Sequence, residues 1–161
     1  YCRLVFGDSD VLPGLVVDRF GTTVAVQVSL AGMEQALPEI ISALRVVVGP
    51  TTIVLKNDGK LRAGEGLDSY VRVEQGQLLD GGLVELEENG TRFLAPIMTG
   101  QKTGWFYDHR LNRERMCHYV RGKRVLDVCS YIGAWGVQAA RAGAPARPAV
   151  AASGRPPSRG G

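Results

Sequence analysis

The pattern of apolar positions predicts short strands in the first third of the chain. Residues 11–20 and 21–30 are rich in Val, Thr and Phe, which are typical of strands, and Phe20-Gly21-Thr22 lies where the two would join. Another apolar run, residues 51–58, ends in the turn-forming sequence Asn57-Asp58-Gly59. These patterns predict three strands, with the first two connected directly.

A helix and a hairpin are predicted from the same kind of pattern. Apolar residues recur every three or four positions from Met33 to Val47, which predicts a helix with one buried stripe. Pro38 lies inside this pattern, so we expect the helix to begin near Leu37 or to be kinked there. Residues 83–94 have the form of a hairpin around Asn89-Gly90, a pair that favours the type I′ turn.

Beyond residue 95 the pattern predicts a helix, a strand and a second helix. The first helix is expected from about Asp108 to Val120, with Asp108 as its N-cap. Val125 to Val128 is expected to be a buried strand, and Ala134 to Ala142 the helix that follows it, ended by Gly143. A strand that turns through small residues into a helix is how a doubly wound α/β domain begins.

The predicted fold class is therefore a small α+β domain followed by the truncated start of an α/β Rossmann-like domain. We place the α+β domain at residues 1–95 and the Rossmann-like start at residues 96–144. Residues 145–161 contain four prolines, three glycines and no bulky apolar residue beyond Val150, a composition that predicts disorder. The change near residue 144 is abrupt, and we expect an out-of-frame tail from a frameshifted or fragmentary coding sequence.

Composition points to an ordinary globular protein. Of the 161 residues, 45% are hydrophobic and 22% are charged. No apolar run approaches the ~20 residues that span a bilayer, and no secretory signal is visible. The cysteines Cys2, Cys117 and Cys129 show no CxxC spacing and no nearby histidine at metal-ligand spacing. We therefore expect free thiols, no metal, no membrane association and a cytoplasmic protein.

The net charge of +3 comes from the end of the chain and not from its main part. Three of the 19 basic residues lie beyond Ala144, where there is no acid, so the rest of the chain balances 16 basic against 16 acidic residues. A local basic excess remains between residues 110 and 124. This cluster is either a surface that faces RNA or the solvated face of a helix. The candidate RNA contacts are Arg113, Arg121 and Lys123.

Two neighbouring segments carry the candidate chemistry. Residues 100–110, GQKTGWFYDHR, combine two glycines, a lysine, adjoining aromatic residues, an acid and a base. Residues 124–136, RVLDVCSYIGAWG, form the predicted strand-to-helix turn, where a doubly wound domain receives a nucleotide-like cofactor. This second pattern lacks the further glycines of GxGxxG, and by itself it also fits any βα turn of a parallel sheet.

The first segment resembles the GQKTG-aromatic-aromatic-Asp-x-Arg pattern of the S-adenosylmethionine-dependent large-subunit ribosomal RNA 5-methylcytosine methyltransferases, which have a class I, Rossmann-like catalytic domain. The opening of the chain is similar to the small α+β domain that precedes the catalytic domain in that family. Its GDSDVLPGL stands for an ESDGLPGL-like turn, with Val11 where glycine is usual. The resemblance, from Leu4 to about Ala144, implies S-adenosyl-L-methionine as cofactor, ribosomal RNA as partner, and methyl transfer to carbon 5 of a cytosine.

The chemistry of that cofactor matches several side chains. Arg110 suits its carboxylate, Asp108 its ammonium, and Phe106 or Tyr107 its sulfonium or its flat ring. Gly133 lets backbone approach a ligand closely. The alternative is that the aromatic residues pack at a domain joint and that Asp108 only caps the next helix. The candidate cofactor-binding residues are Gln101, Thr103, Gly104, Phe106, Asp108, Arg110, Asp127, Ser130, Tyr131 and Gly133.

Part of the family's chemistry has no counterpart in this sequence. The reaction needs a cysteine thiolate that attacks carbon 6 of the base, and in the family this cysteine and an Asp-Pro-Pro loop lie well downstream of the first cofactor motif. The sequence has no Asp-Pro-Pro, Cys117 and Cys129 lie at the wrong places, and the acid expected to bind the ribose is lacking. We therefore name no catalytic residue and expect the chain to be inactive alone. The alternatives are a non-catalytic RNA-binding module or a methyltransferase of the same class with another substrate.

Overall fold

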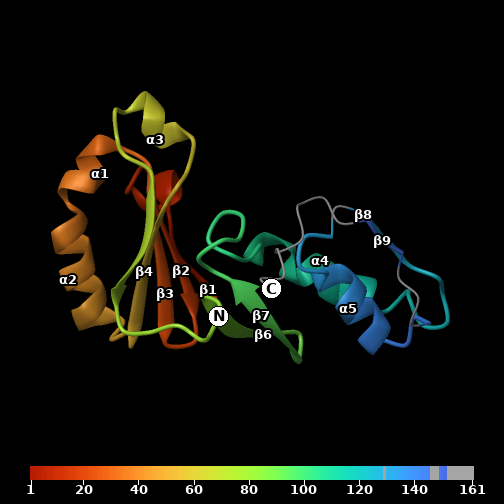
Figure 1. Cartoon of the computed structure of the whole chain (residues 1–161). Helices are drawn as coiled ribbons and strands as arrows, with labels where there is room; N and C mark the ends of the chain where they lie inside the picture. The colour runs from red at the N-terminus through yellow and green to blue at the C-terminus, as the bar shows by residue number, and fades with distance from the viewer. Residues whose placement is uncertain (129, 146–148, 152–161) are drawn as a thin grey trace, which may run out of the picture. The chain divides into compact units, whose positions relative to one another are not determined.

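The computed structural model describes residues 1–128, 130–145 and 149–151, and it divides into two compact units (Figure 1). The first unit contains Tyr1–Glu88 and Arg92–Tyr107, and the second contains Asn89–Thr91 and residues from Asp108 onward. This division differs from the predicted boundary at residue 95. The expectations for Cys129 and for residues 146–148 and 152–161 lie outside the described residues.

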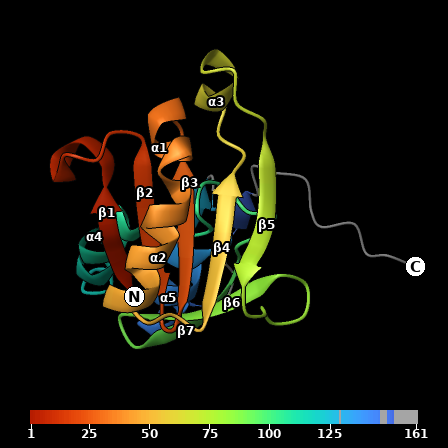
Figure 2. The same ribbon diagram turned by 90° about the vertical axis from the view of Figure 1, so that its left-hand side faces the viewer.

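The first unit is built on a five-stranded sheet. Its strands are β1 (Cys2–Phe6), β2 (Leu15–Phe20), β3 (Thr23–Val28), β4 (Thr52–Asn57) and β5 (Tyr70–Gln75), and they lie side by side in this order (Figure 2). Neighbouring strands are antiparallel except β3 and β4, which are parallel. The predicted strands are confirmed as β2, β3 and β4, while β1 and β5 were not predicted.

The parallel pair requires a crossover, which is provided by two helices on one face of the sheet (Figure 2). These are α1 (Ala31–Gln35) and α2 (Leu37–Val47), with Pro38 in the first turn of α2. The predicted break near Leu37 is confirmed, since proline is tolerated in the first helical turn but not in the interior. Leu37, Ile41 and Leu44 of α2 are buried in one cluster with the inward side chains of β2, β3 and β4.

Three smaller elements lie outside the five-stranded sheet. A 3-10 helix, η1 (Gly7–Asp10), leads from β1 towards β2, and α3 (Leu61–Gly64) lies between β4 and β5. The hairpin of β6 (Leu83–Glu88) and β7 (Thr91–Pro96) confirms the prediction. Asn89 has φ of 50° and Gly90 has φ of 70°, the positive values that a type I′ turn requires.

The second unit has a parallel strand pair and two short helices. It contains α4 (Arg110–Met116), β8 (Leu126–Val128), α5 (Ala134–Arg141) and β9 (Ala149–Ala151), and β8 pairs with β9 in parallel. The predicted order of strand, turn and helix is thus confirmed, but the expectation of a buried strand is wrong, because Leu126 and Val128 of β8 are exposed. Its apolar cluster is small, formed by Val120, Ala139 and Ala144.

Three further expectations for this region were wrong. Asp108 lies inside a 3-10 turn, η2 (Tyr107–His109), and His109 takes the N-cap position of α4 without a capping side-chain hydrogen bond. That helix also ends at Met116 instead of Val120. Within the range predicted to be disordered, Ala149–Ala151 forms a strand because β8 offers it a hydrogen-bonding partner.

Two features are not found in the part of the chain that the structure describes. No helix there is both long enough and apolar enough to cross a bilayer. No group of three or more His, Cys, Asp or Glu side chains in those residues is arranged to hold a metal ion.

Candidate functional site

Residues 100–107 form a strap on the first unit, and the residues at its centre are buried. Thr103 and Trp105 are buried, whereas Gln101 and Lys102 are exposed and Phe106 is half-buried. The strap therefore has an anchoring side and an outward side, and we call residues 100–107 the strap from here on.

The anchoring side is held by hydrogen bonds to the sheet and the hairpin. The Thr103 hydroxyl donates to the Asp18 carboxylate, and Trp105 Nε1 donates to Glu88 Oε2 at 3.0 Å. The Trp105 ring also packs on Phe93, with 4.9 Å between ring centroids. These contacts explain why residues 92–107 belong to the first unit.

Tyr107 closes the strap. Its hydroxyl donates to the backbone oxygen of Arg19 at 2.7 Å, and its ring lies 5.6 Å from that of Phe20. Burial raises the pKa of Tyr107, and the charge of Asp18 raises it further. The phenol is therefore a permanent hydrogen-bond donor at physiological pH.

Position 104 requires glycine because the backbone of Ile97 lies close to it. Its φ is +106°, and a Cβ there would lie 3.3 Å from the Cα of Ile97. Gly104 and Thr103 thus have packing roles, and this placement argues against their predicted direct contact with the cofactor.

Two candidate cofactor-binding residues, Gln101 and Phe106, lie on the outward side. Lys102 Nζ lies 4.9 Å from the centroid of the Phe106 ring, a cation–π contact. A ring face that attracts an ammonium also suits a sulfonium cation. Cofactor contacts at Phe106 and Gln101 remain predictions that this placement permits.

In the second unit, Asp127 caps the helix after the strand. Its side chain is buried and Oδ2 accepts the Gly136 backbone N–H at 3.0 Å. The N-cap residue Gly133 has φ of 78° and no side chain to do so. A carboxylate at the helix N-terminus is favoured by its unpaired N–H groups and its dipole. Asp127 therefore fixes the turn.

The turn itself contains an unpartnered hydroxyl. Ser130 is 5% exposed, and among the described residues its Oγ has no hydrogen-bond partner. Its backbone oxygen accepts the Gly133 N–H at 2.8 Å, and Tyr131 between them has φ of 54°. Buried polar groups are nearly always paired, and strained backbone gathers at ligand sites. The turn thus fits a ligand with a polar group near Ser130.

The remaining candidates of the second unit lie on its surface. Asp108 and Arg110 are both exposed, and the Asp108 carboxylate lies 3.8 Å from His109 Nε2. Arg121 and Lys123 are also exposed. Asp108 and Arg110 are thus accessible to a ligand, and their cofactor contacts stay predictions. Arg121 and Lys123 are accessible in the same way, and their RNA contacts also stay predictions.

Arg113 requires a correction. It is 2% exposed, and its guanidinium carbon lies 5.7 Å from the centroid of the Trp135 ring. The side of α4 that carries Arg113 is turned into the unit, so its charge is not available to a phosphate. The burial of Arg113 argues against its predicted RNA contact, and the contacts of Arg121 and Lys123 stay predictions.

Cys117 is poorly suited to act as a nucleophile. Its Sγ lies 3.3 Å from the backbone oxygen of Arg113, and burial raises the pKa of its thiol above the ordinary value. A raised pKa lowers the thiolate fraction at neutral pH. This agrees with the expectation that Cys117 does not replace the family's nucleophile.

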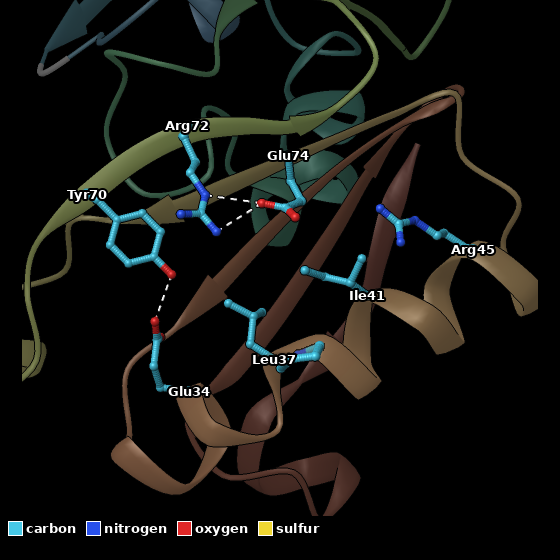
Figure 3. A pocket seen from close by; sticks show the side chains of 8 residues that line it. Glu34, Leu37, Ile41, Arg45, Tyr70, Arg72 and Glu74 are labelled. Carbon is cyan, nitrogen blue, oxygen red and sulfur yellow. Dashed lines mark hydrogen bonds and ion pairs between the residues drawn. The ribbon is translucent and has the colours of Figure 1, made fainter.

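Sequence reasoning missed Asp18, Glu88 and a cavity beside β5. The cavity, of ≈ 400 Å³, is lined by residues of α1, α2 and β5 (Figure 3). The Tyr70 hydroxyl donates to Glu34 at 2.7 Å, and Arg72 pairs with Glu74 at 3.0 Å. None of the predicted site residues lines this cavity. The only sequence signal for Asp18 was an acid among the apolar residues of LVVDRF.

Over 141 residues the chain is 36% identical to ribosomal RNA large subunit methyltransferase I from Shigella boydii. The chain is similar to a ribosomal RNA methyltransferase. The match covers 88% of this chain and 35% of the relative, so the chain spans about a third of that protein's length. No protein-family model matches the chain.

Solved structures agree. A protein from Streptococcus mutans assigned to the S-adenosylmethionine-dependent methyltransferases has a TM-score of 0.74 and 28% identity, with 89% of this chain and 36% of that chain covered. A methyltransferase structure complexed with SAH (S-adenosylhomocysteine) gives the same TM-score of 0.74 and 28% identity. The predicted resemblance to S-adenosylmethionine-dependent methyltransferases is confirmed, and these matches support the Rossmann-like methyltransferase fold.

Proposed function

We propose that this chain is part of an S-adenosylmethionine-dependent methyltransferase that modifies large-subunit ribosomal RNA, and that its β8–α5 turn binds the cofactor. The observation that carries the proposal is the buried Ser130 hydroxyl, which has no hydrogen-bond partner among the described residues and lies in a turn with positive φ at the start of α5. The similarity to a structure complexed with SAH supports it.

The cofactor, when bound, supplies a methyl group on a sulfonium that a nucleophile can accept. In this proposal Ser130 donates its hydroxyl hydrogen to an oxygen of the cofactor, and Gly133 leaves room for the ligand beside the backbone. Asp127 keeps the turn in place through the Gly136 N–H. Gln101 and Phe106 of the strap remain proposed contacts for the cofactor's polar and cationic groups.

The finer assignment is methylation of carbon 5 of a cytosine. It is supported by the strap motif of residues 100–110 and by the ribosomal RNA named for the relative. The sequence contains no Asp-Pro-Pro, and Cys117 is half-buried with a raised thiol pKa. We therefore propose that the 161-residue chain binds cofactor without turnover.

Titration calorimetry with SAH tests the cofactor site. The wild-type chain is expected to bind, and Ser130→Ala is expected to weaken binding about fivefold to tenfold, equivalent to ~1–1.4 kcal/mol for one hydrogen bond. Ser42→Ala, on the exposed side of α2, is the matched control and should leave the affinity unchanged. Absence of binding by the wild type, or equal affinities for both variants, contradicts the proposal.

A second candidate function is RNA binding without catalysis, favoured by the exposed Arg121 and Lys123. Each residue that contacts a phosphate releases counterions, so Arg121→Ala should weaken binding and reduce the salt slope by about 1. Arg113→Ala is the control, because its buried charge should affect stability and leave the salt slope unchanged. RNA binding without SAH binding would favour this second function.

A further inference from the structure

Asp18 is a fully buried carboxylate in the middle of β2. Arg3 of β1 donates to both of its oxygens, from Nε to Oδ1 at 2.8 Å and from Nη2 to Oδ2 at 2.9 Å. The Thr103 hydroxyl also donates to Oδ2. The carboxylate thus receives three hydrogen bonds inside the first unit.

The third of these hydrogen bonds differs from the other two. Arg3 and Asp18 face each other in the register of β1 and β2, so their ion pair needs only the hairpin-like pairing of these strands. Thr103 comes from 85 residues further along the chain. A buried carboxylate is stable only when its lone pairs accept hydrogen bonds. The Asp18 carboxylate is therefore most stable when the strap places a hydroxyl beside it.

This preference sets the register of the strap. Gly100 N donates to Pro96 O at 2.7 Å and Gly104 N to Gln101 O at 2.9 Å, so the backbone around Thr103 is tightly folded. A shift by one position would place Lys102 or Gly104 at the carboxylate. Neither a lysine stem nor a glycine reproduces the contact of a short hydroxyl.

We propose that Asp18 is a positioning residue: through the Thr103 hydroxyl it fixes the register of the strap and keeps Gln101 and Phe106 on the outward side. The strap register depends only on contacts within the first unit. The consequence for the cofactor rests on the proposed function.

Hydrogen exchange measured by NMR on the full 161-residue chain tests the register. Thr103→Val keeps the shape and removes the hydroxyl, and it should accelerate exchange of the Gly100 and Gly104 amides at least tenfold. Thr103→Ser restores the hydroxyl and should keep both rates within about twofold of wild type. If Thr103→Val does not fold, Thr103→Ala is the second variant, since it cannot crowd the site.

Thr52→Val is the matched control. Thr52 is buried in β4 of the same unit and its hydroxyl donates to the backbone oxygen of Gln77 at 2.9 Å. This variant loses a comparable hydrogen bond and should leave the Gly100 and Gly104 amides unchanged. Equal acceleration in the control, or none in Thr103→Val, overturns the proposal.

SAH affinity separates positioning from stability. Thr103→Val should weaken SAH binding at least fivefold, with recovery in Thr103→Ser and no change in Thr52→Val. If the strap amides accelerate but SAH affinity stays constant, the register serves stability alone and the positioning role is refuted. If the wild type does not bind SAH, the proposed function is wrong, while the exchange rates still decide the register.

Discussion

Replacing Val11 with glycine is expected to stabilise the first unit. Val11 follows η1 with φ of 60° and ψ of 26°, in the left-handed region. A Cβ in this region crowds the following carbonyl and costs roughly 1–2 kcal/mol, with β-branched residues the least tolerant. The side chain is 86% exposed, so its removal sacrifices little apolar burial.

The expected gain in the free energy of unfolding is smaller than the strain energy that is released. Glycine has more freedom in the unfolded chain, which offsets roughly 0.5–1 kcal/mol of the gain. The free energy of unfolding should therefore rise by about 0.5–1 kcal/mol. For a unit of this size that corresponds to roughly 2–8 °C in Tm. Urea titration and scanning calorimetry of the full chain measure both quantities.

Two variants separate backbone strain from loss of an exposed valine. Val11→Ala keeps the Cβ and should retain most of the strain. Val46→Gly changes an equally exposed valine, 83% accessible, within α2, and should lower stability by roughly a few tenths of a kcal/mol. The strain argument is refuted if Val11→Gly is no more stable than wild type, or if Val11→Ala stabilises equally.

Three further perturbations follow from buried groups. Burial alone raises the pKa of Glu34, but hydrogen bonds led by that from Arg62 hold it below 4.5. A lowered carboxyl pKa adds stability above the unfolded pKa and loses it as pH falls through the folded pKa. Glu34→Gln should therefore be less stable at pH 7 and lose less stability than wild type below about pH 4.5 in denaturant titrations. Cys2 is exposed and the pKa of Cys117 is raised by burial, so mass spectrometry should find iodoacetamide on Cys2 first. Trp105→Phe removes the donor to a buried carboxylate and should lower the free energy of unfolding by about 2–3 kcal/mol, measured by urea titration.

Local signals in the sequence were sufficient for most elements. The Asn89-Gly90 turn, the Pro38 break in the helical pattern and the stop at Gly143 each act within a few residues, and each is found in the structure. By contrast, β5 was not predicted, because YVRVEQ carries polar residues and its strand depends on pairing with β4.

In the candidate site too, contacts between residues far apart in the sequence could not be predicted. The motif located the strap and the β8–α5 turn, but it could not show which side chains of the strap point inward. That choice depends on Asp18, which lies 85 residues from Thr103. Arg113 was misplaced for a similar reason, since the side of α4 that meets Trp135 is determined by packing within the second unit.

The hairpin turn has a consequence for the chemical ageing of the protein. Asn89-Gly90 suits a turn with two positive φ angles, but asparagine followed by glycine is also the pair that deamidates most readily. In the folded chain Asn89 Nδ2 donates to the backbone oxygen of Arg110 at 3.1 Å and to Gln138 Oε1 at 3.0 Å, which restrains the amide. Deamidation would place a carboxylate against these two oxygens and replace both hydrogen bonds with repulsion. Each excursion to the unfolded state therefore exposes this amide to irreversible damage, and the damaged chain refolds less well than the original.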